Sequence, residues 1–73
     1  MKKIEIKLPH GDYYDVVSHE SSVDTLEDTG LQEGDVVVIK EVDGDKLTGN
    51  QIQREIRHIF RDNCKSGYCT VVY

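Results

Sequence analysis

The side chains best suited to chemistry are the basic residues of the last third of the chain. Residues 46–65 hold five bases and two acids, whereas residues 12–45 hold eleven acids and one base. Lysine and arginine bind phosphate groups, and arginine does so through two parallel hydrogen bonds. On a strand, Arg57 and Arg61 would share one face while Arg54 points to the other. The pattern predicts a nucleic-acid site made by Lys46, Arg54, Arg57, Arg61 and Lys65.

The acidic segment, residues 12–45, offers the opposite chemistry. The whole chain has a net charge of −5, and an acidic surface repels phosphate. An acidic face can instead steer association with a basic surface. A basic protein partner is therefore the alternative to nucleic acid. The simplest interpretation of the charge pattern is plain solubility, with both signs on solvated faces.

Other reactive residue types do not predict a catalytic or metal centre. Ser18, His19 and Asp24 are the residue types of a hydrolase triad, but closeness in a loop does not provide triad geometry. Cys64 and Cys69 fall short of the four ligands of a structural zinc site. We expect no catalytic residue, no metal and no cofactor. The cysteines are expected to be thiols, with a disulfide across the turn between them as the alternative.

Hydrophobic patterning predicts the elements that must position these residues. Residues 2–8 alternate between apolar and polar, which indicates a half-buried strand. An apolar run between two turns indicates a buried central strand at residues 35–42. Residues 12–18 fit either a helix or a strand, and so do residues 48–61. Short strands are expected within residues 22–26 and at residues 68–73.

The length of the chain predicts a single domain, residues 1–73, with a thin core. That core is expected to hold Ile4, Ile6, Val36 and Val38. No apolar stretch approaches the roughly 18 residues that cross a membrane. The first lysines are followed by alternating rather than continuous apolar residues, so no signal peptide is expected. The predicted location is the cytoplasm.

The blocks GDVVVIKE at residues 34–41 and LTG at residues 47–49, followed by Ile52, Ile56 and Ile59, give the chain a family resemblance. It resembles a small ASCH-type domain of the PUA-like superfold, closest to short bacterial and phage proteins of unknown function. The resemblance implies a small curved β-barrel with one short helix after the first strand. It therefore favours a helix at residues 12–18 and one long strand at residues 48–61.

The ASCH signature, G-x-K-x-x-E-x-R, matches this chain poorly. The corresponding residues are His19, Ser21, Asp24 and Leu26. The lysine that could activate a nucleophile or water is absent, and the arginine that could bind a phosphate is absent too. The fold can therefore be expected without the nucleoside amidohydrolase activity of some relatives.

RNA is the usual partner of the superfold, so the resemblance implies a non-enzymatic RNA-binding module. The alternative is a protein-interaction domain, such as a phage-encoded inhibitor, that uses its acidic face. A degenerate nucleoside hydrolase is the third and weakest hypothesis, because fold alone is poor evidence of function.

Overall fold

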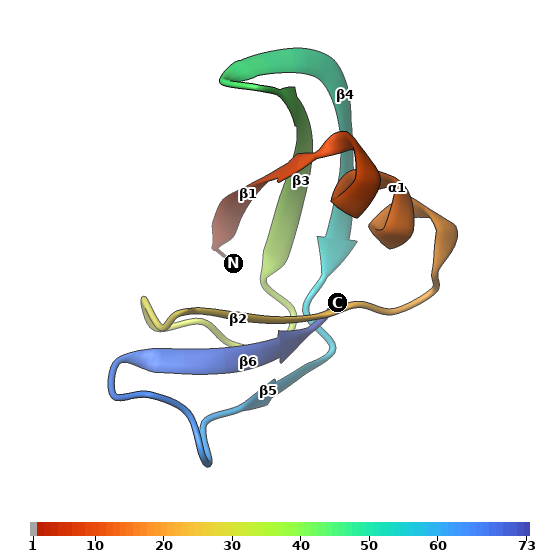
Figure 1. Cartoon of the computed structure of the whole chain (residues 1–73). Coiled ribbons are helices and arrows are strands. Elements are labelled where there is room, and N and C mark those ends of the chain that lie inside the picture. The colour runs from red at the N-terminus through yellow and green to blue at the C-terminus, as the bar shows by residue number, and fades with distance from the viewer. Residues whose placement is uncertain (1) are drawn as a thin grey trace.

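The computed structural model describes residues 2–73 as two three-stranded sheets and one helix (Figure 1). The strand orders are β1-β3-β4 and β2-β6-β5. Strands of the second sheet run across those of the first (Figure 1). The expected class, mainly β with one short helix, is confirmed. The elements are β1 (Lys3–Pro9), α1 (His10–Ser18), β2 (Val23–Glu27), β3 (Val36–Asp43), β4 (Lys46–Glu55), β5 (His58–Phe60) and β6 (Tyr68–Val72).

Strand β3 is the central strand of the first sheet, as predicted. It pairs in parallel with β1 and antiparallel with β4. Its Val37 and Ile39 are completely buried. Ile4 and Ile6 lie opposite these two residues in the register and pack against the core, which confirms their predicted place.

The predicted burial of Val36 and Val38 is confirmed in part. Val36 is only half-buried, and Val38 is buried but lies outside the core cluster, on the face opposite Val37 and Ile39. Side chains alternate along a strand, so a shift of one residue exchanges its two faces. A run of four apolar residues contains no polar residue to mark the outer face. The sequence pattern therefore identified the strand but not its orientation.

Helix α1 confirms the helical interpretation of residues 12–18 and begins two residues earlier, at His10. Pro9 ends β1 and is also the N-cap of the helix, with φ −62° and ψ 164°. Proline holds φ near this value, so the chain turns directly from strand into helix. Asp12 lies in the first turn, where a negative charge suits the helix dipole. Val16 is the buried residue that anchors the helix to the core.

The predicted long strand at residues 48–61 is extended but not continuous. It breaks between β4 and β5 at Ile56 and Arg57. The backbone of Ile56 pairs with the chain before β3, donating to the Asp35 carbonyl at 2.8 Å and accepting from the Gly34 amide at 2.9 Å. The next amide, that of Arg57, donates to the Val72 carbonyl at 2.8 Å. One residue step thus transfers the chain from the first sheet to the second.

The predicted barrel is not confirmed. The strand pairings of residues 2–73 form two separate sheets and do not close on each other. Within the same described range, no helix is long and apolar enough to cross a membrane.

The second sheet contributes its inner face to the core. The short strand expected within residues 22–26 is β2, and the last strand is β6. Cys69 and Val71 of β6 are completely buried. Cys69 and Cys64 are both free thiols, as expected. Burial raises the pKa of the Cys69 thiol. The Cys64 sulfur lies 3.3 Å from the hydroxyl of Thr70, the residue after Cys69. Because side chains alternate along a strand, the two cysteines lie on opposite faces of β6.

A buried carboxylate secures the β3–β4 hairpin. Glu41 is 5% exposed and sits where the strand register shifts between Lys40 and Val42. It accepts hydrogen bonds from the Thr48 hydroxyl at 2.7 Å and the Asn50 amide at 3.0 Å, and it lies 2.6 Å from the His10 ring nitrogen. These hydrogen bonds lower the pKa of Glu41 to about 2, and the bond from Thr48 has the largest effect.

The core assignment can be tested by truncating Ile39. Ile39→Ala leaves a cavity in the middle of the central strand, so we expect the free energy of unfolding to fall by about 2–5 kcal/mol in urea denaturation. Gln53→Ala, on the exposed side of β4, is the control and should change stability by roughly 0.5 kcal/mol or less. Equal effects of the two substitutions would contradict this core.

The hairpin carboxylate predicts a dependence of stability on acid. Because the pKa of Glu41 is lowered in the folded protein, its contribution is complete above pH 4.5 and is lost as the pH falls toward 2. Glu41→Gln should therefore reduce stability at pH 7 and flatten its decline between pH 5 and about 2. Urea denaturation across this range measures both effects. An acid decline as steep as that of the control, Glu27→Gln, would contradict the role given to Glu41.

Candidate functional site

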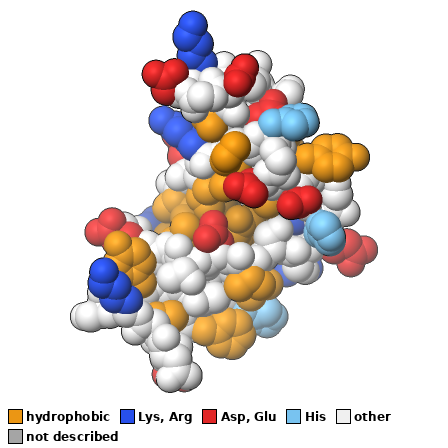
Figure 2. Space-filling view, viewed as in Figure 1, with side chains coloured by type: hydrophobic (Ala, Val, Ile, Leu, Met, Phe, Trp, Pro, Cys, Tyr) orange, Lys and Arg blue, Asp and Glu red, His pale blue; other side chains and the backbone are white. Residues whose placement is uncertain are grey.

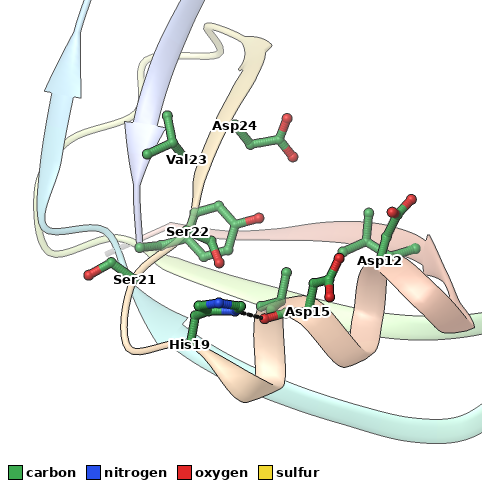
Figure 3. A pocket seen from close by; sticks show the side chains of 10 residues that line it. Asp12, Asp15, His19, Ser21, Ser22, Val23 and Asp24 are labelled. Carbon is green, nitrogen blue, oxygen red and sulfur yellow. Dashed lines mark hydrogen bonds between the residues drawn. The ribbon is translucent and has the colours of Figure 1, made fainter.

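An open hollow of about 470 Å³ lies between α1 and β2 (Figure 3). Asp12 and Asp15 come from one face of the helix, three residues apart. Asp24 comes from β2 on the opposite side. Figure 3 shows these helix carboxylates facing Asp24 across the hollow. The complete lining is Leu8, Asp12, Asp15, Val16, His19, Ser21, Ser22, Val23, Asp24 and Tyr73.

Backbone hydrogen bonds hold the loop that forms the side of the hollow. Ser22 and Tyr73 exchange two of them, at 2.7 and 2.9 Å. The amide of His19 donates to the Val16 carbonyl at 3.3 Å, and its ring nitrogen lies 2.6 Å from the Asp15 carbonyl (Figure 3). The loop is thus fixed to the helix end and to the last strand.

The hollow combines hydrogen-bond acceptors with an apolar wall. The carboxylates of Asp12, Asp15 and Asp24 accept hydrogen bonds and carry negative charge. The pKa of the Tyr73 phenol is raised, mainly by burial and to a smaller extent by the negative charge of Asp24. Figure 2 shows acidic side chains bordering hydrophobic ones in the middle of this face of the molecule. Such a surface suits a ligand that has N–H donors or a cationic group on an apolar body.

A second hollow of about 590 Å³ adjoins the first. Its lining is Glu20, Arg54, Glu55, Arg57 and Tyr73. Tyr73 therefore separates the two hollows. Arg57 donates to the Ser21 hydroxyl at 3.4 Å, and Ser21 lines the first hollow. An exposed guanidinium thus lies where the acceptor-rich hollow meets its neighbour.

Arg54 has a structural role that its sequence position did not reveal. Its Nη2 donates to the carbonyls of Val16 at 2.6 Å and His19 at 2.7 Å. These are carbonyls at the carboxyl end of α1, where a positive charge is favourable. Its Nη1 is buried without a hydrogen-bond partner among the described residues. Arg54 therefore holds the helix against β4.

Arg61 is also committed to the structure. Its Nε donates to Asp28 at 2.7 Å, and its Nη2 donates to the Leu31 carbonyl at 2.7 Å. The contact lowers the pKa of Asp28 and raises that of Arg61. The predicted placing of Arg57 and Arg61 on one strand face is thus wrong, because both residues lie just outside β5 and their side chains border different hollows. The structure brings Arg57 together with Arg54 instead.

The two predicted lysines lie away from these arginines. Lys46 lies opposite Asp43 in the strand register, at the tip of the β3–β4 hairpin. Lys65 lies in the β5–β6 loop, with its ammonium group 5.5 Å from the centre of the Tyr68 ring. The five basic residues therefore do not form one patch, and their binding of phosphate stays a prediction.

The hollow contains residues that the basic pattern did not indicate. Only the helical spacing of Asp12 and Asp15 could have indicated that these residues lie together. No local feature of the sequence indicates Tyr73. His19, Ser21 and Asp24, by contrast, are positions matched to the ASCH signature, and all three line the hollow.

The fold and the hollows define a small two-sheet β domain with an open, acceptor-rich hollow. Residues 3–72 match a family model described as Domain of unknown function (DUF3850), and the chain belongs to this family. A comparison with curated proteins finds no match.

The structural role of Arg54 can be tested directly. Arg54→Ala removes two charge-assisted hydrogen bonds to the helix end, so stability should fall by about 1.5–3 kcal/mol in urea denaturation. Amide hydrogen exchange should also become faster in α1. Arg57→Ala, which removes the same charge from a more exposed residue, should leave helix exchange unchanged. Similar exchange in both variants would contradict the assignment.

Proposed function

We propose that the domain is a non-catalytic RNA-binding module that takes one unpaired base into the hollow between α1 and β2. The observation that carries the proposal is the position of Arg57, whose guanidinium borders a hollow lined by carboxylates. A nucleotide has the matching polarity, because its base offers N–H donors and its phosphate is negative. The hollow volume of about 470 Å³ is typical of small-ligand sites.

The carboxylates decide which part of a nucleotide can enter. Asp15 and Asp24 would repel a phosphate but accept hydrogen bonds from the amino groups of cytosine, adenine or guanine. Leu8 and Val23 offer apolar contact to the face of the base. Arg57 remains outside the carboxylate wall, where the phosphate backbone would pass. This arrangement reconciles RNA binding with a net charge of −5.

We do not extend the proposal to catalysis. The resemblance to ASCH domains places Ser21 where a reactive lysine is expected and Leu26 where an arginine is expected. Asp24 alone lacks the partner that would activate water or a nucleophile. We propose a diverged, cytoplasmic member of the PUA-like superfold, of bacterial or phage origin, that binds RNA without hydrolysing it.

A second candidate function is the binding of a basic protein, for example as a phage-encoded inhibitor. The observation that favours it is the same set of carboxylates at the edge of an apolar wall. A lysine or arginine side chain could lay its carbon stem on that wall and its charge on Asp12 and Asp24. On this alternative Arg57 would be an obstacle rather than a contact.

The RNA proposal is tested by fluorescence anisotropy with a labelled single-stranded RNA at about 50 mM salt, where electrostatic binding is favoured. Arg57→Ala should weaken binding roughly threefold to tenfold and reduce the salt slope by about 0.7, the value for one phosphate contact on a single strand. Lys46→Ala removes the same charge at the far hairpin and should change neither quantity. Asp24→Asn should alter the preference among the four bases.

Two results would overturn the proposal. One is no binding of the intact protein at this salt concentration. The other is an equal effect of Arg57→Ala and Lys46→Ala. Binding of a labelled oligolysine peptide that Asp24→Asn weakens and Arg57→Ala strengthens would establish the basic-protein alternative instead.

A further inference from the structure

The alternation of buried and more exposed side chains along β6 defines the outer face of the second sheet. Cys69 and Val71 point into the core, so Tyr68, Thr70 and Val72 point outward. The register extends this face across the neighbouring strands. Val72 lies beside Val23 and His58, Thr70 beside Thr25 and Phe60, and Tyr68 beside Glu27.

No element of residues 2–73 packs on this outer face. Helix α1 contacts β1 and β3 of the first sheet. Phe60 is 55% exposed, Tyr68 38% and Val23 67%. Figure 2 shows large hydrophobic side chains gathered beside a histidine on the lower part of the molecule, where β2, β6 and β5 lie in Figure 1. These side chains leave the outer face open to solvent.

The aromatic rings on this face come from two neighbouring strands, β5 and β6. The ring centres of His58 and Phe60 lie 6.3 Å apart. Tyr68 is the diagonal neighbour of Phe60, because it lies two residues from Thr70, the residue opposite Phe60. Diagonal pairs on a sheet are about 7–8 Å apart. On the same face, the Thr70 hydroxyl lies 3.4 Å from the Thr25 hydroxyl and 3.3 Å from the Cys64 sulfur.

A lysine beside one of the rings offers a contact to a phosphate group. Lys65 holds its ammonium group 5.5 Å from the Tyr68 ring, on the loop that joins β5 and β6. The other two bases of this part of the chain lie elsewhere, Arg57 at the hollow and Arg61 on Asp28. Glu27 shares the face itself, and the Glu33 carboxylate lies 3.8 Å from the His58 ring nitrogen. A phosphate contact on this face would therefore be made by Lys65, beside the Tyr68 ring.

The size of the face argues against a second copy of the chain as its occupant. Three strands of three to five residues, at roughly 3.3 Å per residue and 4.8 Å between strands, cover about 200 Å². A stable protein interface takes about 800 Å² from each partner. The face suits two or three stacked bases, for which aromatic rings on a sheet are an effective platform.

We propose that this outer face, His58, Phe60 and Tyr68 with Lys65, is a stacking platform for two or three unpaired bases of a single-stranded RNA. The inference rests on the proposed function and deepens it, because it specifies an extended single strand as the partner. Val23 connects the two surfaces, since it belongs to the outer face by register and also lines the hollow. A strand that crosses β2 at Val23 could place the next base beside Asp24.

The test uses the intact protein and a labelled six-nucleotide single-stranded RNA in anisotropy titrations. The double variant Phe60→Ala with Tyr68→Ala should bind at least about tenfold more weakly, because base–aromatic stacking is lost. Phe60→Trp with Tyr68→Phe should retain affinity, and Phe60→Leu with Tyr68→Leu should not, although it keeps apolar side chains. Leu47→Ala, at another exposed apolar residue, should have no effect. Urea denaturation confirms that each variant is folded.

The outcomes separate the platform from the hollow. If Arg57→Ala weakens binding but the aromatic variants bind normally, the platform is overturned and the proposed function stands. If the aromatic variants alone lose affinity, the platform is supported and the hollow is not the base site. If the intact protein does not bind, both fall. A competing double-stranded RNA should fail to displace the single strand, and equal competition would overturn the platform.

Discussion

The burial of β3 is the constraint on which the rest of the structure depends. Val37 and Ile39 are completely buried, and the other core residues, among them Val16, Ile56 and Val71, form one cluster with them. A chain of 73 residues has little further apolar area to bury. Buried carboxylates therefore hold both ends of the strand. Asp35 accepts the amides of Lys2 and Gln32 at 2.9 Å each before β3 begins, which lowers its pKa, and Glu41 secures the hairpin near the other end.

This thin core also determines which charges are available for binding. Arg54 is used to hold α1, and Arg61 is used to hold the loop at Asp28 and Leu31. Arg57 and Lys65 are left exposed, one beside the hollow and one beside the outer face of the second sheet. The proposed RNA sites thus depend on the basic side chains that are not needed to hold the fold together, rather than on the total number of bases.

Sequence reasoning recovered the elements that rest on local pattern. Alternation identified β1, turn residues bounded β3, and the resemblance selected helix for residues 12–18 and strand over helix for the segment after Lys46. It could not locate the break at Ile56, because no glycine or proline marks it and its cause is pairing with Gly34 and Asp35, far away in the sequence.

The candidate site was harder to foresee for the same reason. The number of bases pointed to Arg54 and Arg61 as binding residues. Both side chains instead bond to carbonyl or carboxylate groups about 30 or more residues away, and the sequence does not show that these groups lie nearby. The hollow joins residues from α1, the following loop, β2 and Tyr73. Only the positions matched to the ASCH signature, His19, Ser21 and Asp24, pointed to it in advance.

The most direct test of RNA binding is an NMR titration of the isotope-labelled protein with a short single-stranded RNA at about 50 mM salt, a concentration that favours electrostatic binding. We predict saturable shifts of backbone amides around Ser21 and Asp24 beside the hollow, and around Phe60 and Thr70 on the outer sheet face. Amides at the tip of the β3–β4 hairpin should not move. A spectrum that stays unchanged at saturating RNA, or shifts confined to that hairpin, would contradict this prediction.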